Sequence, residues 1–279
     1  MSETGKAAIV TGAAGGIGRV FVRTLLAAGI GVTATDRDEG PLAALAAAAR
    51  GDGHAAELLT FRCDLATDGA AEAIADAARA RFGRVDILVN NAGIGPGAVR
   101  PDSWQRPLQF WEITPEIWRR FVAVHTAAPL ALANAVVHDM IARRWGRIVN
   151  VTTSLGTMLA AGMPSYGPSK AALEALSAIM AKDLAGTGIT VNVLVPGGVT
   201  NTPMISDEAG FERARLIQPE VMGPPLAWLV SEAAQNVTGR RFLAIHWNAA
   251  LPPAEAGAKC GAPVAWSDIA TPPITPLRK

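Results

Sequence analysis

The sequence contains little cysteine and no excess of charge, and both absences narrow its function. Its two cysteines, Cys63 and Cys260, lie far apart without the spacing typical of metal ligands. They imply no disulfide framework, which favours a reducing, cytoplasmic location. Lys and Arg number 25 against 24 Asp and Glu, so nothing indicates nucleic acid or an anionic membrane as a partner. His54 and His138 also lack a partner at ligand spacing, so we expect a small-molecule partner and no metal.

Long hydrophobic runs are missing as well. The first residues contain no apolar core of a signal sequence and lead into an expected strand. The longest apolar stretch, 121–137, contains His125, Pro129 and Asn134, which makes it too short and too polar for a membrane span. We expect a buried helix at a subunit contact there, and no membrane partner.

What the sequence does contain is an alternation of short β-branched runs with Ala- and Leu-rich helical stretches. The predicted strands span residues 7–11, 32–36, 58–63, 87–90, 148–151, 190–195 and 242–245. The predicted helices span residues 16–28, 41–50, 69–82, 115–143, 165–184 and 224–231. This alternation predicts an α/β fold with a doubly wound parallel sheet of about seven strands and helices on both faces. The strands are continuous apolar runs, as expected when both faces are buried.

Three segments interrupt this alternation. Residues 95–114, rich in Gly, Pro and aromatics, form an insert that either caps a hydrophobic substrate or packs onto the domain. Residues 203–223 are poorly periodic and follow a strand end, where α/β folds bind ligands, so they are a candidate lid. The Pro-rich extension 251–279 should be extended, either as a free end or packed through 264–266 on a pocket or a neighbouring subunit. We therefore predict one domain, 1–250, followed by this extension.

A glycine-rich segment follows the first predicted strand and opens a helix. Its residues Gly12, Gly16 and Gly18, with Ile17 between the last two, allow a tight turn. They also let backbone N–H groups approach a pyrophosphate at the helix N-terminus. The position between a strand and a helix makes this motif a predicted dinucleotide site.

An acidic residue, Asp36, ends the second predicted strand 18 residues beyond Gly18. A carboxylate there can accept both ribose hydroxyls of NAD and would repel the extra phosphate of NADP. The alternative interpretation is an ordinary turn residue at a strand end. Arg37 follows immediately and could pair with that phosphate. The sequence favours NAD and leaves NADP open.

The only tyrosine of the chain, Tyr166, stands four residues before Lys170, so the two side chains share one face of a predicted helix. A free phenol titrates near pH 10, and a nearby ammonium favours the phenolate. The pair therefore indicates a residue that gives and takes a proton. The same spacing also occurs in ordinary helices, and its weight depends on the motifs upstream.

Together these motifs resemble the short-chain dehydrogenase/reductase family, in its single-domain branch, over about residues 6–242. The resemblance rests on five motifs in order: Thr11-Gly12-x-x-x-Gly16-Ile17-Gly18, Asp64-Leu65, Asn90-Asn91-Ala92-Gly93, Tyr166-x-x-x-Lys170 and Pro196-Gly197-Gly198-Val199. It implies a Rossmann-type sheet and an NAD(P)-dependent oxidoreductase.

The resemblance also implies roles for individual residues. Asp64, with Leu65 after it, would bind the adenine amino group. The remaining cofactor contacts would come from Asn90, Ala92, Gly93, Val199 and Thr202. Tyr166 would exchange a proton with the substrate oxygen. Lys170 would bind the nicotinamide ribose and lower the pKa of the phenol.

The chain departs from the family pattern at the catalytic serine. That serine stands thirteen residues before the tyrosine and three before a glycine, and both counts lead to Thr153. Threonine keeps the hydroxyl that bonds the substrate oxygen and adds a methyl group that narrows the pocket. Ser154 would point elsewhere if the strand continues, so Thr153 is the predicted catalytic hydroxyl.

The second departure is His125, which stands where the family has an asparagine at a helix kink. The backbone carbonyl of that residue holds a water in a proton relay to the lysine. Pro129 cannot donate a hydrogen bond to the carbonyl four residues earlier, which is that of His125. We hypothesise that Pro129 leaves this carbonyl free and that His125, titrating near neutrality, joins the relay. The alternative is a core histidine in a bent helix.

These features predict an NAD(P)-dependent alcohol dehydrogenase or carbonyl reductase that acts on a hydrophobic or cyclic secondary alcohol or ketone. The alternative is a non-catalytic nucleotide-binding regulatory or scaffold protein, favoured only by the two departures. An epimerase or dehydratase would usually carry a larger substrate domain. The resemblance also implies a homodimer or homotetramer assembled through residues 115–143 and 165–184.

Overall fold

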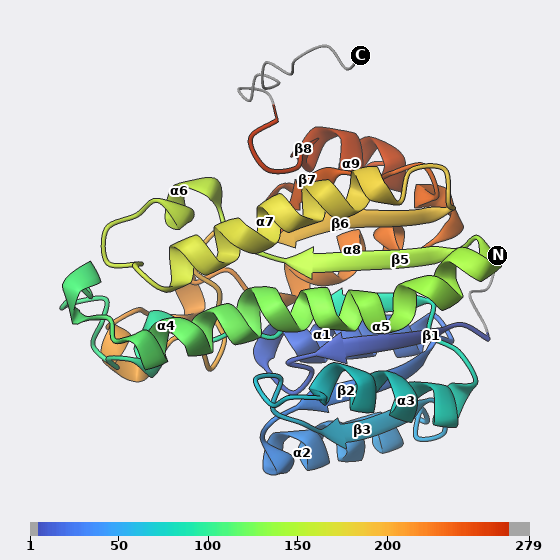
Figure 1. Cartoon of the computed structure of the whole chain (residues 1–279), viewed down its shortest axis with the longest axis horizontal. Helices are drawn as coiled ribbons and strands as arrows, with labels where there is room; N and C mark the ends of the chain where they lie inside the picture. The colour runs from blue at the N-terminus through green and yellow to red at the C-terminus, as the bar shows by residue number, and fades with distance from the viewer. Residues whose placement is uncertain (1–4, 268–279) are drawn as a thin grey trace, which may run out of the picture.

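The computed structural model describes residues 5–267, which form one sheet flanked by helices (Figure 1). The strands are β1 (Ala7–Thr11), β2 (Gly31–Asp36), β3 (Leu58–Arg62), β4 (Ile87–Asn90), β5 (Gly146–Val151), β6 (Ile189–Val195), β7 (Arg240–Leu243) and β8 (Gly261–Pro263). They lie in the order β3-β2-β1-β4-β5-β6-β7-β8, and all neighbours are parallel except β7 and β8. The doubly wound α/β fold is therefore confirmed, with an eighth strand that the sequence pattern did not predict.

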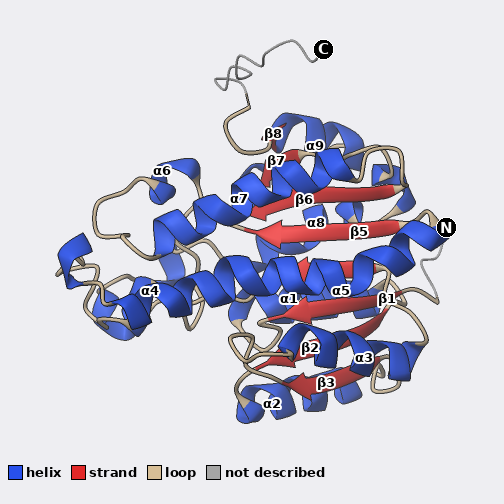
Figure 2. Cartoon of the chain, in the orientation of Figure 1, coloured by secondary structure: helices blue, strands red, loops and turns tan. Residues whose placement is uncertain are grey.

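Helices cover both faces of this sheet (Figure 2). They are α1 (Gly16–Ala27), α2 (Glu39–Gly51), α3 (Ala70–Phe82), α4 (Pro115–Val122), α5 (Ala128–Arg143), α6 (Leu155–Met158), α7 (Tyr166–Asp183), α8 (Gly223–Leu229) and α9 (Pro253–Cys260). Helices α3, α5 and α7 lie in front of the sheet in the view of Figure 1, and α1, α2 and α8 lie behind it. Two apolar cores follow, one on each face.

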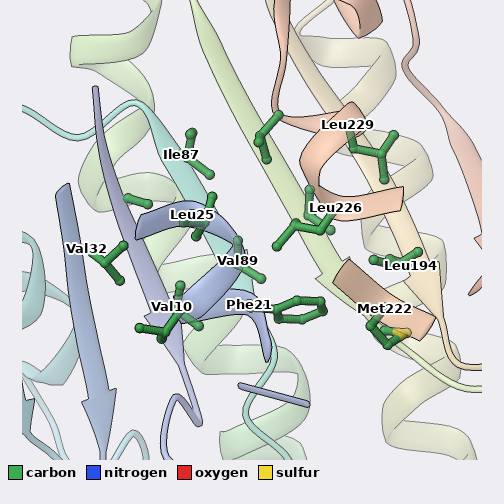
Figure 3. Packing of buried hydrophobic residues seen from close by; sticks show 14 of the residues in the cluster. Val10, Phe21, Leu25, Val32, Ile87, Val89, Leu194, Met222, Leu226 and Leu229 are labelled. Carbon is green, nitrogen blue, oxygen red and sulfur yellow. The ribbon is translucent and has the colours of Figure 1, made fainter. Parts of the chain in front are cut away.

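The core behind the sheet shows why the strands are apolar throughout. Val10 and Val89 point from β1 and β4 toward Phe21 of α1, and Leu226 of α8 lies beside them (Figure 3). These side chains are almost fully buried. Removing a phenylalanine such as Phe21 from a core typically costs about 3–5 kcal/mol. This packing fixes the ends of β1 and β4. The cofactor site predicted from the sequence lies between these two strand ends.

A single helix over 115–143 was predicted, and the structure divides it. Thr114 caps α4 by accepting a hydrogen bond from the Ile117 N–H at 3.3 Å, and Pro115 occupies the first turn, where no N–H is needed. One π-helical turn, Ala123–Ala127, then separates α4 from α5. Pro129 follows this turn, and its missing N–H prevents the ordinary α-helical bond to the His125 carbonyl. The predicted irregularity at His125 is therefore present.

The run Pro115–Arg143 is also the one candidate membrane span found among residues 5–267. It is long and apolar enough to cross a membrane by length and composition alone. In the structure its α5 part packs against α3 and the sheet, and Leu132, Val136 and Met140 are buried in the core in front of the sheet. This is the arrangement of a core helix.

The extension after residue 250 is not the extended segment that was predicted. Helix α9 begins at Pro253, a position in the first helical turn that tolerates proline, and its Gly257 lies against the Trp228 ring of α8. Strand β8 then pairs antiparallel with β7, and Val264 is buried against the sheet. The prolines start and flank short elements here. Residues 264–266 were expected to pack on a pocket or a neighbouring subunit, and Val264 packs on the chain's own sheet. Residues 268–279 lie outside the described residues.

Smaller differences concern element ends. Strand β7 covers Arg240–Leu243 instead of 242–245, and Ala244–His246 form a single 3-10 turn. The short helix α6 was not predicted, because four residues carry too little periodicity to be recognised. The lid segment contains three further 3-10 turns, Asp207–Ala209, Arg213–Arg215 and Pro219–Met222.

Candidate active site

The predicted site residues meet at the carboxyl ends of the central strands. The chain leaves β1 toward β2 on one side, and β4 pairs with β1 on the other. In sheets of this kind ligands bind where the strand order reverses, outside the carboxyl ends. Figure 1 shows the strand arrows ending near α4 and α6, on the side where the site lies.

The glycine-rich loop packs closely against its neighbours because Gly12 and Gly18 carry no side chains. Gly12 has φ 61°, and a Cβ there would lie 2.7 Å from the Ala92 Cα. A Cβ on Gly18 would lie 2.0 Å from the Gly12 carbonyl oxygen. Helix α1 begins at Gly16 with no side-chain cap, so its first N–H groups are available to an anion. The loop therefore fits a dinucleotide pyrophosphate.

Asn91 belongs to the Asn90-Asn91-Ala92-Gly93 motif, and the resemblance implies no role for its side chain. The structure shows a structural role for it. Its Nδ2 donates to the Thr11 and Gly12 carbonyls at 2.9 and 3.0 Å. The Thr11 hydroxyl in turn accepts from the backbone N–H groups of Asn91 and Ala92, each at 3.0 Å. These bonds hold the loop after β4 against the glycine-rich loop. An amide beside a glycine-rich turn is the sequence signal that could have identified it.

The acidic residue Asp36 contacts the glycine-rich loop directly. Its two carboxylate oxygens accept from the backbone N–H groups of Ala14 at 3.1 Å and Arg37 at 2.8 Å. The exposed Arg37 side chain pairs with Asp38 at 3.4 Å. Asp36 therefore lies at the loop edge where a ribose would be bound, and the Arg37 guanidinium is engaged by a neighbouring carboxylate.

Asp64, the predicted adenine contact, is paired with Arg120 of α4 at 2.9 Å. Its other oxygen accepts from the Ala66 N–H at 3.0 Å. The hydrogen bond from Arg120 lowers the pKa of Asp64, so this carboxylate is ionised at neutral pH. Leu65 turns its side chain toward the core in front of the sheet.

The side chain of Asn90 points into the sheet. It is buried in the sheet, where its Nδ2 donates to Asn150 Oδ1 of β5 at 2.8 Å. Asn90 therefore ties β4 to β5. Gly93, three residues on, does face the site, because a Cβ on it would lie 3.2 Å from His125 Nε2 and 3.5 Å from Lys170 Nζ.

The residues of the last cofactor motif lie under the lid. Thr202 contacts the start of α1, since a Cβ on Gly16 would lie 2.8 Å from its Cγ2. Ile17 follows in α1 and packs into the core behind the sheet. Val199 is half-buried, and its carbonyl accepts from the Ile217 N–H at 3.1 Å. The segment after β6 is thus folded over the glycine-rich loop.

Tyr166 and Thr153 meet through their hydroxyl groups, which form a hydrogen bond. Ser154 turns away, because its hydroxyl caps α6 by accepting from the Thr157 N–H at 3.3 Å. Burial raises the pKa of the Tyr166 phenol, and the bond from Thr153 partly opposes this. The sequence had predicted a lowered pKa, and this expectation is wrong for the structure described.

Lys170 also differs from the expectation. Its Nζ is buried and donates to the Val151 carbonyl at 2.8 Å, at the end of β5. Burial lowers the pKa of Lys170 from 10.5 to about 7, so the ammonium is only half populated at neutral pH. Desolvation therefore weakens the positive charge that was expected to favour the phenolate.

His125 is fully buried with both ring nitrogens engaged. Its Nε2 accepts from the Ile94 N–H at 2.9 Å, which places the ring proton on Nδ1, 2.8 Å from Ser169 Oγ. Ser169 Oγ in turn donates to the Ser165 carbonyl at 2.7 Å. Burial, followed by repulsion from Lys170, lowers the pKa of His125 well below 6.5. The prediction that His125 titrates near neutrality is therefore wrong.

The predicted lid, 203–223, contacts the aromatic insert. Trp104 of the insert meets Phe211 of the lid edge to face at 5.0 Å, and the Ser206 hydroxyl donates to the Pro101 carbonyl at 2.7 Å. Met204 of the predicted lid lies against the loop after β4, because Cβ atoms on Gly93 and Gly95 would lie 3.5 Å and 2.7 Å from its side chain. Within residues 5–267 no cluster of three His, Cys, Asp or Glu side chains could hold a metal ion.

Several known proteins are similar to this chain in sequence. Residues 6–212 match the short chain dehydrogenase family. The 3-oxoacyl-[acyl-carrier-protein] reductase FabG of Escherichia coli (strain K12) is 32% identical over 247 residues, covering 86% of this chain and 95% of FabG. The cis-4-hydroxycyclohexanecarboxylate dehydrogenase of Sinomonas cyclohexanicum is 34% identical over 243 residues, covering 84% and 92%.

Solved structures agree. A metagenomic short-chain oxidoreductase in complex with NADP has a TM-score of 0.72 at 30% identity, covering 87% of this chain and 97% of its own. A putative NAD(P)-dependent gluconate 5-dehydrogenase from Beutenbergia cavernae, with bound NADP, has a TM-score of 0.73 at 30% identity, covering 87% and 95%. The chain therefore belongs to the short-chain dehydrogenase/reductase family and is an NAD(P)-dependent oxidoreductase of carbonyl or alcohol groups.

Proposed function

We propose that the protein transfers a hydride between nicotinamide and a secondary alcohol or ketone that is hydrophobic or cyclic. The observation that carries this proposal is the hydrogen bond between the hydroxyls of Tyr166 and Thr153, with Lys170 one turn along the same helix. Two hydroxyls that meet in this way can both bond one substrate oxygen. Of the two relatives, one is named for a cyclic alcohol and the other for a 3-oxoacyl group.

A bound nicotinamide would supply or accept the hydride, and side chains of the protein would transfer the proton. During reduction Tyr166 Oη donates its proton to the substrate oxygen, and Thr153 Oγ1 orients that oxygen. The phenolate then regains a proton through Lys170, whose pKa of about 7 suits transfer in both directions at neutral pH. The His125 ring acts by holding Ile94 and Ser169 in place.

We propose NAD as the preferred cofactor. Gly12, Gly16, Ile17 and Gly18 would hold its pyrophosphate, and Asp36 would bind its adenosine ribose. The supporting observation is the position of Asp36 at the glycine-rich loop, together with the pairing of Arg37 to Asp38. The two solved relatives hold NADP, so Asp36→Ala should shift the ratio of kcat/KM toward NADPH. An unchanged ratio would contradict this preference.

The remaining contacts follow from the same positions. Asp64 would bind the adenine, and Ala92, Gly93, Val199 and Thr202 would line the nicotinamide half (Val199 through its backbone). Segment 203–223 would act as the lid, with Met204 facing the substrate.

We also propose a cytoplasmic homodimer or homotetramer assembled through α4, α5 and α7. Partly exposed apolar side chains on these helices, Trp118, Leu130, Ile141 and Ile179, support a subunit contact. Light scattering after size exclusion measures the mass directly. A monomer at micromolar concentration would contradict the proposal.

The activity itself is tested by absorbance at the nicotinamide band. NADH and NADPH are each offered with ketones from small aliphatic to bulky cyclic, and NAD⁺ with the matching alcohols. Turnover that disappears in Tyr166→Phe supports the reductase. Cofactor binding without turnover on any substrate would overturn it and favour a regulatory or scaffold protein.

A further inference from the structure

One face of α7 lies beside the end of β5. Its side chains form hydrogen bonds with successive residues there. Tyr166, Lys170 and Glu174 follow one another at intervals of four, so they form one stripe on the helix. The stripe meets three consecutive residues: Lys170 Nζ donates to the Val151 carbonyl, the Thr152 hydroxyl donates to Glu174 Oε2 at 2.7 Å, and the Thr153 and Tyr166 hydroxyls bond each other. The mechanism uses two members of this stripe and leaves Glu174 without a function.

Glu174 is a fully buried carboxylate whose oxygens are all engaged. Its Oε1 accepts from Arg241 Nε at 2.9 Å and from the backbone N–H of Ala265 at 3.0 Å. Arg241, on β7, is almost as buried and uses a second nitrogen to donate to the Thr153 carbonyl at 3.0 Å. A guanidinium can reach two acceptors at fixed angles because its donors form a rigid fork.

The C-terminal segment enters this network through its backbone. Strand β8 pairs with β7 so that Arg241 lies opposite Ala262. Val264 is buried against Val193 and Val195 of β6, Ala265 adopts φ 61°, and its N–H donates to Glu174. A non-glycine residue at positive φ is uncommon and costs energy unless its surroundings hold it.

We propose that Glu174 and Arg241 are positioning residues that couple the C-terminal segment 261–265 to the hydroxyl of Thr153. Arg241 fixes the Thr153 carbonyl, Glu174 fixes Arg241 and Thr152, and Ala265 fixes Glu174. The segment thereby sets the distance between the Thr153 and Tyr166 hydroxyls. This inference rests on the proposed function, because Thr153 acts on substrate only within that mechanism.

Arg241→Lys separates the two contacts of the guanidinium. Lysine keeps the charge opposite Glu174 but is a point donor, so it cannot also hold the Thr153 carbonyl in the same geometry. Arg84→Lys is the matched control, because Arg84 also forks onto a fully buried carboxylate, Asp86, at the opposite end of the sheet.

The readout is the titration of the chain's one tyrosine, followed as the ¹³Cζ resonance of labelled full-length protein. The Thr153 bond lowers the phenol pKa, so a displaced Thr153 should raise it, by about 0.5–1 unit in Arg241→Lys. We also expect about a tenfold lower kcat/KM with an unchanged Kd for NADH, and neither effect in Arg84→Lys. A tyrosine titration that stays at the wild-type value, or moves equally in both variants, would overturn the inference.

A second pair of variants, at Ala265, tests the same inference if Arg241→Lys does not fold. Ala265→Pro removes the N–H and cannot adopt φ 61°, whereas Ala265→Gly keeps the N–H and accepts this φ easily. Ala265→Pro should raise the tyrosine pKa and Ala265→Gly should not. Equal titrations in the two would again overturn the inference. Since this titration needs no turnover, an inactive protein with a shifted tyrosine would contradict the proposed function alone.

Discussion

Two buried charged groups at opposite ends of the sheet, Asp86 and Lys170, have contrasting surroundings. At the amino ends of the strands, Asp86 is fully buried but receives two bonds from Arg84 at 2.7 Å and the Ala7 N–H at 2.9 Å. At the carboxyl ends, Lys170 is equally buried, and its Nζ donates to a neutral carbonyl. A buried charge that faces no opposite charge shifts its pKa instead of gaining stability. The paired Asp86 thus stabilises the fold, whereas Lys170 is placed to exchange a proton.

The strongest test of this contrast removes the proton donor. Tyr166→Phe keeps the ring and deletes the hydroxyl that meets Thr153. We expect kcat to fall by about 10³-fold, within the range for losing a general acid, while the Kd for the cofactor and the melting temperature stay near wild type. Steady-state kinetics and cofactor fluorescence measure both. Substantial residual turnover would mean that another group supplies the proton.

The corresponding change at the amino end should do the reverse. Arg84→Met leaves the buried Asp86 with a weaker set of partners, the Ala7 N–H and Arg143 at 3.4 Å. We expect the free energy of unfolding to fall by about 2 kcal/mol, discounted because Arg84 is partly exposed. Urea unfolding gives this value, and kcat of the folded enzyme should not change. A loss of kcat without a loss of stability would break the contrast.

Lys170 should cost stability in a pH-dependent way. Its pKa is 10.5 before folding and about 7 in the folded protein, so the unfolded chain binds more protons between these values. Folding stability attributable to Lys170 therefore rises between pH 7 and 10.5, by at most about 1.4 kcal/mol per pH unit. The Lys170→Met variant has no ionisable group at this position and lacks this pH dependence of stability. The stability gap between the variant and wild type, from urea unfolding at pH 7 and 9, should narrow as pH rises, and a constant gap would contradict the lowered pKa.

The smallest effect should come from the π-helical turn. Pro129→Ala restores an N–H that can bond the His125 carbonyl and return the turn to α-helical geometry. We expect turnover to fall by roughly fivefold, the worth of about one hydrogen bond, with cofactor binding unchanged. Pro115→Ala, in the first turn of α4, is the control that loses no such contact. Equal activity in both variants would remove the free carbonyl from the proposed relay.

Much of this organisation is readable from local sequence. The continuous apolar runs predict the seven parallel strands, because a strand buried on both faces needs no polar alternation. The glycine-rich turn and the Tyr166–Lys170 pair each depend on contacts between residues close in sequence. Their positions at the starts of α1 and α7 could therefore be predicted. The choice of Thr153 follows from the resemblance to the family, whose serine stands thirteen residues before the tyrosine.

The parts that escaped prediction depend on distant contacts. The pKa of Tyr166 and Lys170 follows from desolvation by surrounding elements, which no spacing records. Asn90 belongs to a cofactor motif, yet its side chain bonds Asn150 across the sheet. Helix α9 was not predicted because prolines precede it and occupy its first turn. Strand β8 has only three residues, and it forms by pairing with the edge of β7.

That short last strand has a consequence for the behaviour of the protein at high concentration. An exposed sheet edge offers free N–H and C=O groups to other chains and is a common starting point for aggregation. Strand β8 covers the edge of β7 and ends in Pro263, which has no N–H to offer. Strand β8 thereby hinders the pairing of another chain at this edge of the sheet.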